Sequence, residues 1–167
     1  MTCSCCLPSR RQSHVLGFLI AAGLMAFALY LQHVQGEDPC PLCIFQRVVM
    51  IAHGALFLVA ALHHPGPRGQ RMYAGLLALV ALGGAAIAAR HVWLQHLPPD
   101  QVPACGPGLS YILAAHPFLQ ALSVVLKGSG ECAAVGWTFL GLSIPEWTLF
   151  WFLALGLLGA LQPFNRR

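Results

Sequence analysis

Four long apolar segments limit what this chain can fold into. They run from His14 to Val34, from Ile44 to Leu62, from Met72 to Ala89 and from Trp147 to Leu161. A helix needs about 20 apolar residues to cross a hydrocarbon core of roughly 30 Å, and the last segment is the shortest by that standard. Only 8% of the residues are charged and the mean hydropathy is +0.69, whereas about a quarter of a soluble domain is charged. The sequence therefore predicts an integral membrane protein.

The charged residues predict how these segments are oriented. We expect one all-α domain over residues 1–167, a four-transmembrane-helix bundle with spans at about 14–34, 44–62, 72–89 and 145–162. Arginines lie before the first span, between the second and third, and after the fourth: Arg10, Arg11, Arg68, Arg71, Arg166 and Arg167. By the positive-inside rule these regions are cytoplasmic. The acidic residues then fall on the opposite side, in or beside loops at about 35–43 and 91–144: Glu37, Asp38, Asp100, Glu131 and Glu146.

The first apolar segment could also be read as a secretory signal. It follows Arg10 and Arg11, a pair that resembles a twin-arginine signal. However, its apolar run is longer than a typical signal core, and the residues from Val34 to Glu37 lack a small-x-small cleavage site. We therefore expect an uncleaved membrane span.

A Cys-x-x-Cys pair, Cys40 and Cys43, stands at the mouth of the second apolar segment. This spacing allows a small disulfide and lowers the pKa of the thiolate. Arg47 follows Cys43 by four residues, so both lie on one helical face, where a guanidinium stabilises a thiolate. The alternative is an arginine that extends to the lipid headgroups as an anchor. The pair, set at a membrane surface, indicates an electron relay.

Two further cysteines, Cys105 and Cys132, are expected in the same compartment as the Cys-x-x-Cys pair. Disulfides persist outside the cytosol, so these two form the second candidate pair. Such a bond could simply staple the loop, or it could exchange with the first pair. Three cysteines near the start of the chain, Cys3, Cys5 and Cys6, fall on the cytoplasmic side and are expected to stay reduced.

Within the long second loop, the segment from Tyr111 to Lys127 is apolar enough to suggest a fifth span. Its apolar residues recur near helical spacing, with polar residues between them. This pattern favours a helix that lies in the membrane interface. A fifth span would also separate Cys105 from Cys132 across the membrane and turn the C-terminal arginines outward.

Several short motifs, taken in order, give the chain a resemblance to a known family. They are Gln32-His33-Val34, Cys40-x-x-Cys43-Ile44 with Arg47, His91, Cys105 and Cys132, Trp137-x-Phe139-Leu140-Gly141-Leu142, and Gln162-Pro163-Phe164. Together they resemble the motifs of the DsbB family. Its members are inner-membrane thiol oxidases that reoxidise the periplasmic dithiol oxidase DsbA and pass the electrons to quinone. The resemblance covers nearly the whole chain.

The resemblance implies a role for each of six residues. Cys105 and Cys132 correspond to the loop pair that exchanges with a DsbA-like thioredoxin-fold partner, which attacks Cys105. Cys40 and Cys43 correspond to the pair beside the quinone, with Cys43 against the ring. Arg47 and His91 correspond to residues implicated in binding the quinone.

The resemblance also implies the setting and the fold. The implied electron acceptor is ubiquinone or menaquinone. The implied location is the bacterial inner membrane, with both termini cytoplasmic and with Cys40, Cys43, Cys105 and Cys132 periplasmic. The implied partners include membrane lipid but no nucleic acid. The family fold is a four-helix membrane bundle with a short interfacial helix in the second loop. From the residues alone, His91 could equally mark the membrane interface, and His53, near the middle of its span, is expected to pack in the core.

Two other classes of function remain as alternatives. The four cysteines Cys40, Cys43, Cys105 and Cys132 could form a metal site, although only the first two have ligand spacing and an oxidising compartment opposes free thiolates. The chain could also be a structural membrane subunit whose disulfides are staples. That alternative leaves Arg47 unexplained.

Overall fold

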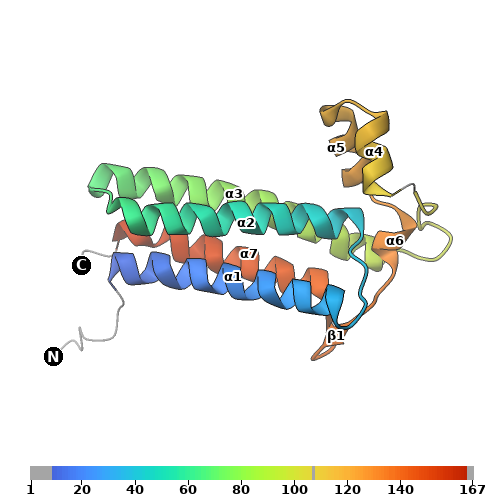
Figure 1. Cartoon of the computed structure of the whole chain (residues 1–167), viewed down its shortest axis with the longest axis horizontal. Helices are drawn as coiled ribbons and strands as arrows, with labels where there is room; N and C mark the ends of the chain where they lie inside the picture. Colours follow the sequence, from blue (N-terminus) through green and yellow to red (C-terminus); the bar gives the residue numbers. More distant parts are fainter. Residues whose placement is uncertain (1–8, 107, 165–167) are drawn as a thin grey trace.

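A computed structural model of the chain describes residues 9–106 and 108–164. Four helices form its body: α1 (Arg10–His33), α2 (Pro41–His63), α3 (Pro67–Gln95) and α7 (Ile144–Ala160). Figure 1 shows these helices running along the long axis, with α3 packed against α2 and α7, and α1 against α2. Helices α1 to α3 are each long and apolar enough to cross a membrane, which fits the predicted all-α membrane protein. Helix α7 is apolar but has only 17 residues, so the fourth span stays a prediction.

Residues at the helix starts explain where the helices begin. The Ser9 hydroxyl accepts a hydrogen bond from the Gln12 backbone N–H, and the Gln12 side chain accepts one from the Ser9 N–H, which caps α1. At the start of α7, the Ser143 N–H donates to the Glu146 carboxylate over 2.6 Å. Prolines open α2 and α3 at positions where the missing N–H would have no helical partner.

Small residues bring α3 and α7 close together. A Cβ atom added to Gly156 would lie 2.6 Å from the Cβ of Ala81, and one added to Gly159 would lie 2.8 Å from the Cβ of Leu77. Gly84 lies in the same way against the ring of Phe152. Inside a bilayer the hydrophobic effect does not drive helices together, so close van der Waals contacts such as these stabilise their association. The glycine- and alanine-rich α3 therefore packs within the chain.

The two ends of the bundle differ in charge. The start of α1, the turn from α2 to α3 and the end of α7 lie at one end, as Figure 1 shows, together with the arginines at positions 10, 11, 68 and 71. The start of α2, the end of α3 and the remaining loops lie at the other end, with Cys40, Cys43, Cys105 and Cys132. Cys3, Cys5, Cys6, Arg166 and Arg167 lie outside the described residues. The arginines at the start of α1 and at the α2–α3 turn thus lie at the opposite end of the bundle from the four cysteines, as the sequence predicts.

Two segments differ from their expected extent. The expected single helix from Tyr111 to Lys127 is two helices, α4 (Leu109–Ala115) and α5 (Phe118–Lys127), because Pro117 holds His116 in an extended conformation between them. Helix α3 begins before the predicted 72–89 span and continues six residues past it to Gln95. His91 is therefore inside the helix and not at the start of a loop.

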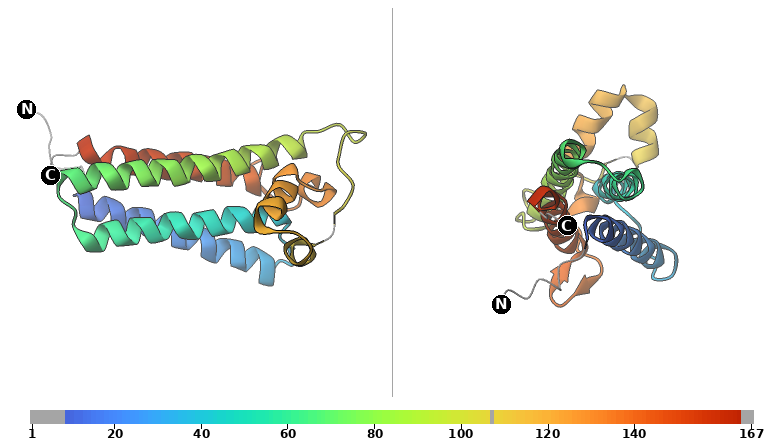
Figure 2. Two further views of the ribbon diagram at one scale, coloured as in Figure 1. Left: turned by 90° about the horizontal axis from the view of Figure 1, so that it is seen from above. Right: turned by 90° about the vertical axis from the view of Figure 1, so that its left-hand side faces the viewer.

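A short hairpin that the sequence did not predict precedes α7. Strands β1 (Thr138–Phe139) and β2 (Leu142–Ser143) pair antiparallel, with Thr138 opposite Ser143. Leu140 and Gly141 form the two-residue turn, both with positive φ, of 53° and 79°. Figure 2 shows this hairpin and the α4–α5 pair projecting on opposite sides of the bundle axis.

The second loop is anchored on the bundle by its own apolar cluster. The cluster joins the start of α2 and the end of α3 to helices α4, α5 and α6 (Gly130–Ala133), and its buried members are Cys40, Leu42, Leu94, Ile112, Ala121, Val125 and Cys132. The Arg90 guanidinium adds hydrogen bonds of 3.3 and 2.8 Å to the backbone oxygens at the end of α5. These contacts of the second loop bring Cys132 to the first loop.

A 3-10 helix, η1 (Gln162–Phe164), follows α7 at the opposite end of the bundle.

Candidate functional site

The Cys-x-x-Cys pair is held by the start of α2. Cys40 is the N-cap residue, and its sulfur accepts a hydrogen bond of 3.4 Å from the backbone N–H of Cys43. Pro41 fixes the first helical position between them. The two sulfurs lie 3.3 Å apart, with Cys40 buried and Cys43 partly exposed. The capping geometry therefore presents a reduced dithiol whose sulfurs are in contact.

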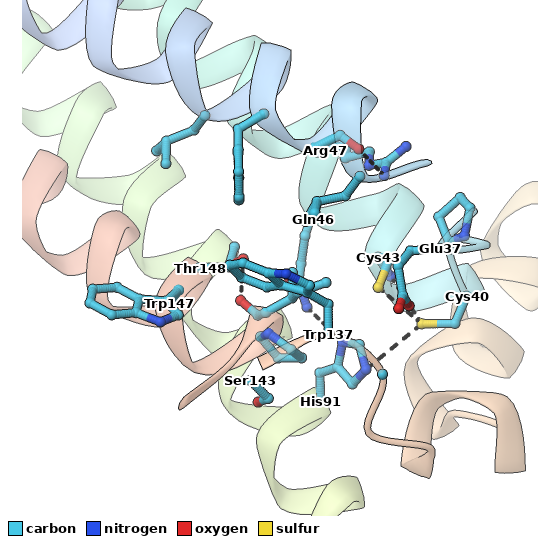
Figure 3. A pocket seen from close by; sticks show the side chains of 18 of the residues that line it. Glu37, Cys40, Cys43, Gln46, Arg47, His91, Trp137, Ser143, Trp147 and Thr148 are labelled. Atoms are coloured by element: carbon cyan, nitrogen blue, oxygen red, sulfur yellow. Dashed lines mark hydrogen bonds between the residues drawn. The ribbon is translucent and has the colours of Figure 1, made fainter. Parts of the chain in front are cut away.

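His91 contacts this pair from α3. It is buried, and its Nε2 lies 3.7 Å from the Cys40 sulfur, as Figure 3 shows. Its Nδ1 lies 3.1 Å from the side-chain nitrogen of Gln46. Because an amide nitrogen donates, Nδ1 accepts in this arrangement and Nε2 carries the proton toward Cys40. The interpretation of His91 as an interface marker is thus replaced by a buried position next to a cysteine.

Gln46 is a site residue that the sequence did not identify. It lies one helical turn after Cys43, is buried, and is the only polar side chain joined to Nδ1 of His91 in the described part of the chain. An uncharged glutamine in an apolar span carries a weak signal. Its position three residues after Cys43 was the clue, because residues three apart lie on one face of a helix.

Arg47 is held by α1 and does not extend freely to lipid headgroups. Its Nη1 donates to the Gln32 side-chain oxygen, and its Nη2 donates to the backbone oxygen of Ala28 over 3.1 Å. The side chain is half-buried and lies on the wall of the same cavity as Cys43. Figure 3 shows the guanidinium at the α1 side of the pocket. A fixed positive charge is therefore present in the cavity that Cys43 enters.

A cavity of about 580 Å³ opens at the cysteine end of the bundle. Residues of all four long helices and of the segment that leads into α7 line it, and its walls are mostly apolar. Three tryptophans contribute to these walls, Trp137, Trp147 and Trp151. Cavities of this size and character typically hold a small organic ligand. Polar groups from Cys43, Arg47 and His91 converge in it, so a ligand there would meet a thiol, a cation and an imidazole.

Cys132 and Cys105 lie in different surroundings. Cys132 is fully buried in the cluster of the second loop, and its thiol lies against the Cys40 thiol. The hydrogen bond to the Cys40 side chain and burial both raise the pKa of the Cys132 thiol. Cys105 is exposed beside Gly130, on the segment between α3 and α4.

The expected bond between Cys105 and Cys132 is not formed in this structure, where all four of these cysteines are free. In this reduced form α6 turns Cys132 inward against Leu42 and Leu94, while Cys105 stays at the surface. The structure thus brings Cys132 to Cys40 and leaves Cys105 accessible.

The group of side chains placed to hold a metal ion is not the four-cysteine set. Within residues 9–106 and 108–164, the group whose ligand atoms all lie within 4.8 Å of one another is Cys40, Cys43 and His91. Cys105 and Cys132 do not belong to it. A histidine therefore takes the place that the sequence alternative gave to the loop cysteines.

Comparisons with known proteins point to one family for the whole chain. The family model described as "Disulfide bond formation protein DsbB" matches residues 10–162. The disulfide bond formation protein B of Methylococcus capsulatus is 55% identical over 159 residues, which are 95% of this chain and 97% of that protein. The proteins of the same name from Hahella chejuensis and Acinetobacter baumannii are 56% and 54% identical, covering 87% and 90% of this chain and 88% and 90% of their own lengths.

Proposed function

The chain belongs to the DsbB family of disulfide bond formation proteins, and from this membership we propose that it oxidises a DsbA-like thioredoxin-fold protein in the periplasm and passes the electrons to membrane quinone. One observation carries the proposal. The Cys132 thiol lies against Cys40, Cys40 lies 3.3 Å from Cys43, and Cys43 opens into an apolar cavity. This arrangement is a continuous path for thiol–disulfide exchange from the loop to a small acceptor.

The first step uses the exposed cysteine. A thiolate of the partner attacks the sulfur of Cys105 in a Cys105–Cys132 disulfide, and the Cys132 thiolate leaves. The second thiol of the partner then attacks the mixed disulfide and leaves Cys105 reduced. Two electrons have entered the chain, and the partner carries a new disulfide. Only an exposed sulfur can meet a folded protein in this way, and Cys105 is the exposed one of the four periplasmic cysteines.

The second step uses the contact between the loops. The Cys132 thiolate attacks Cys40 in the Cys40–Cys43 disulfide, which forms a Cys40–Cys132 bond and releases Cys43 as the free thiolate. Cys40 and Cys43 both line the cavity, and Cys43 is the less buried of the two. The Cys105 thiolate then attacks the sulfur of Cys132 in the Cys40–Cys132 disulfide, which re-forms the Cys105–Cys132 bond and releases Cys40 as a thiolate that takes up a proton. The first loop is thereby left fully reduced.

The cavity suits a quinone head group. A quinone supplies a two-electron, two-proton acceptor on a flat, mostly apolar ring, and the cavity offers tryptophan walls with a few polar groups. Arg47, held in place by Gln32 and Ala28, supplies fixed positive charge where negative charge develops on sulfur and oxygen. His91 carries a proton on Nε2 beside Cys40, and its ring is oriented by Gln46. These residues hold charge and a proton at the reacting end of the cavity.

The proposed setting is the bacterial inner membrane, crossed four times, with both termini cytoplasmic. Arginines at one end of the bundle and cysteines at the other support this orientation. The α4–α5 pair is proposed to lie in the outer interface, since it exposes Tyr111, Leu113 and Leu119 while its other side covers the bundle. Thiol labelling in intact cells tests this topology, and Cys105 should react with a membrane-impermeant reagent once its disulfide with Cys132 has been reduced.

Turnover of the purified protein tests the proposed activity. With a reduced thioredoxin-fold partner and either ubiquinone or menaquinone, one quinone should be reduced for each disulfide formed in the partner. Cys43→Ser should abolish quinone reduction, whereas Cys3→Ser removes a thiol near the start of the chain, outside the proposed path, and serves as the matched control. Partner oxidation without any loss of quinone absorbance would refute the proposal.

A further inference from the structure

We propose that the reduced cysteine end of the bundle binds one zinc ion through Cys40, Cys43 and His91. The proposal needs reduced thiols and the imidazole, and it does not depend on the partner or on quinone. The ligand atoms of these three residues lie within 4.8 Å of one another. The reduced protein would then have a metal site that the oxidised protein lacks.

The distances fit a tetrahedral ion. With zinc–sulfur bonds of about 2.3 Å and zinc–nitrogen bonds of about 2.0 Å, neighbouring ligand atoms are separated by roughly 3.5 to 3.8 Å. The Cys40 and Cys43 sulfurs lie 3.3 Å apart, and the Cys40 sulfur lies 3.7 Å from Nε2 of His91. Both separations therefore need adjustments of only a few tenths of an ångström. The remaining pair, Cys43 and His91, is at most 4.8 Å apart and closes by side-chain rotation.

The charges and the surroundings also favour a zinc ion. Two thiolates and a neutral imidazole neutralise a divalent cation, so a site of this composition is stable in a mostly apolar cavity. Cys40 and His91 are buried, and Cys43 is partly exposed to the cavity. The nearby positive charge of Arg47 is turned toward Gln32 and the backbone of Ala28, to which it donates hydrogen bonds.

Gln46 supports the imidazole from the other side. Zinc coordination at Nε2 requires that Nδ1 carry the proton, so Nδ1 must then donate. The Gln46 amide lies 3.1 Å from Nδ1, and a rotation that exchanges its oxygen and nitrogen turns it into the acceptor. Such an outer partner fixes the ring and strengthens the metal–nitrogen bond. Gln46 is therefore a positioning residue for the zinc site.

Zinc binding has a chemical consequence for the thiols. Binding releases the two thiol protons and forms two zinc–sulfur bonds, with no change in oxidation state. Sulfurs held by zinc cannot re-form the Cys40–Cys43 disulfide until the ion leaves. Affinity should rise with pH as proton release becomes easier, and the disulfide form should not bind.

Cobalt substitution tests the site directly. The reduced, purified protein, with Cys3, Cys5 and Cys6 replaced by serine in every variant, is titrated with Co²⁺ and followed by its thiolate-to-cobalt charge-transfer and tetrahedral d–d absorption. We expect one Co²⁺ per chain, displaced by Zn²⁺, and no absorption after oxidation of Cys40 and Cys43. His91→Ala should weaken Co²⁺ binding at least about tenfold, and Cys40→Ser should abolish the charge-transfer band.

Two further variants keep the test decisive. The double variant Cys105→Ser/Cys132→Ser removes the loop cysteines and should retain the site, whereas His91→Cys should restore affinity with a stronger charge-transfer band. Helical circular dichroism checks that each variant is folded. A reduced protein without the absorption, an unchanged affinity in His91→Ala, or loss of binding in the loop double variant would each overturn the proposal.

Discussion

The two loops that carry the cysteines present their thiols in opposite surroundings. In the first loop, Cys40 and Cys43 are set by a helix start, lie close to His91, and line an apolar cavity. In the second loop, Cys105 is exposed on a segment without regular secondary structure. In the proposed function, the first arrangement takes a small acceptor and the second takes a folded protein. A single buried residue, Cys132, connects them by lying against Cys40.

In the proposed function, this difference keeps the reaction with the protein partner apart from the reaction with the small acceptor. A thiol that must meet another protein has to be accessible, while a thiol that meets a small acceptor is better enclosed, because enclosure excludes water and competing thiols. Cys132 comes from the second loop, but its side chain is fully buried, at 0% exposure, like the enclosed thiol of Cys40. The apolar cluster around Leu42 and Leu94 is what brings it there.

The largest expected effect tests the accessible side. Cys105→Ser should abolish oxidation of the partner, because no exposed sulfur remains for the partner thiolate to attack. Cys132→Ser leaves Cys105 without its resolving thiol, so a mixed disulfide between Cys105 and the partner should persist on non-reducing gels. If neither substitution slows partner oxidation, the loop pair is a staple and the comparison fails.

The next effect tests the enclosed side. Arg47→Met should lower the kcat/KM for quinone by about 10- to 100-fold, because charge developing on sulfur and oxygen loses its counter-charge. Arg47→Lys should be milder but not neutral, since lysine lacks the planar fork that reaches both Gln32 and Ala28. Arg71→Met, at the opposite end of the bundle, is the matched control. Quinone kinetics at saturating partner measure the effect, and unchanged values for Arg47→Met would reduce Arg47 to an anchor.

A smaller effect compares the two loop cysteines in the reduced protein. Alkylation by iodoacetamide should be at least about tenfold faster at Cys105 than at Cys132, which is buried. The raised pKa of Cys132 means that its thiolate is scarce at neutral pH, so its alkylation rate should still be rising above pH 9. Mass spectrometry of the labelled peptides gives both rates. Equal alkylation rates at Cys105 and Cys132 would show that the Cys132 thiol is as accessible to the reagent as the Cys105 thiol.

Much of this organisation could be predicted from the sequence, because the signals are strong and local. Apolar length and the arginine distribution indicated the helices and the two ends of the bundle. The spacing of Cys43 and Arg47 placed these two residues on one helix face. His53 was expected to pack in the core, and it does so at 0% exposure, stacked on Phe57 with a centroid distance of 5.0 Å.

The remainder depended on contacts between distant segments. That Cys132 would meet Cys40, that Gln46 would orient His91, and that Gln32 would hold Arg47 follow from how α1, α3 and α6 pack on α2. No periodicity or spacing within one segment reports such packing. The break in the helix between α4 and α5 was readable from Pro117, but the apolar pattern that continues across it suggested one helix.

The smallest expected effect compares the two buried histidines. Within the described residues, His53 has no hydrogen-bond partner at either ring nitrogen, whereas His91 contacts both Cys40 and Gln46. His53→Phe should therefore change the melting temperature only slightly, by an amount equivalent to less than about 1.5 kcal/mol, and leave quinone kinetics unchanged. His91→Phe should raise the quinone KM. A loss of activity in His53→Phe would mean that the middle of the bundle also takes part in the reaction.

The central claim is that electrons pass between the loops through Cys132 and Cys40, and disulfide mapping tests it most directly. In a protein with Cys43→Ser and Cys105→Ser, mild oxidation should produce a Cys40–Cys132 bond that peptide mass spectrometry identifies. The matched variant with Cys40→Ser and Cys105→Ser retains Cys43 and Cys132, and it should form its bond at least about tenfold more slowly. Faster bond formation through Cys43, or no Cys40–Cys132 bond at all, would contradict the path between the two loops.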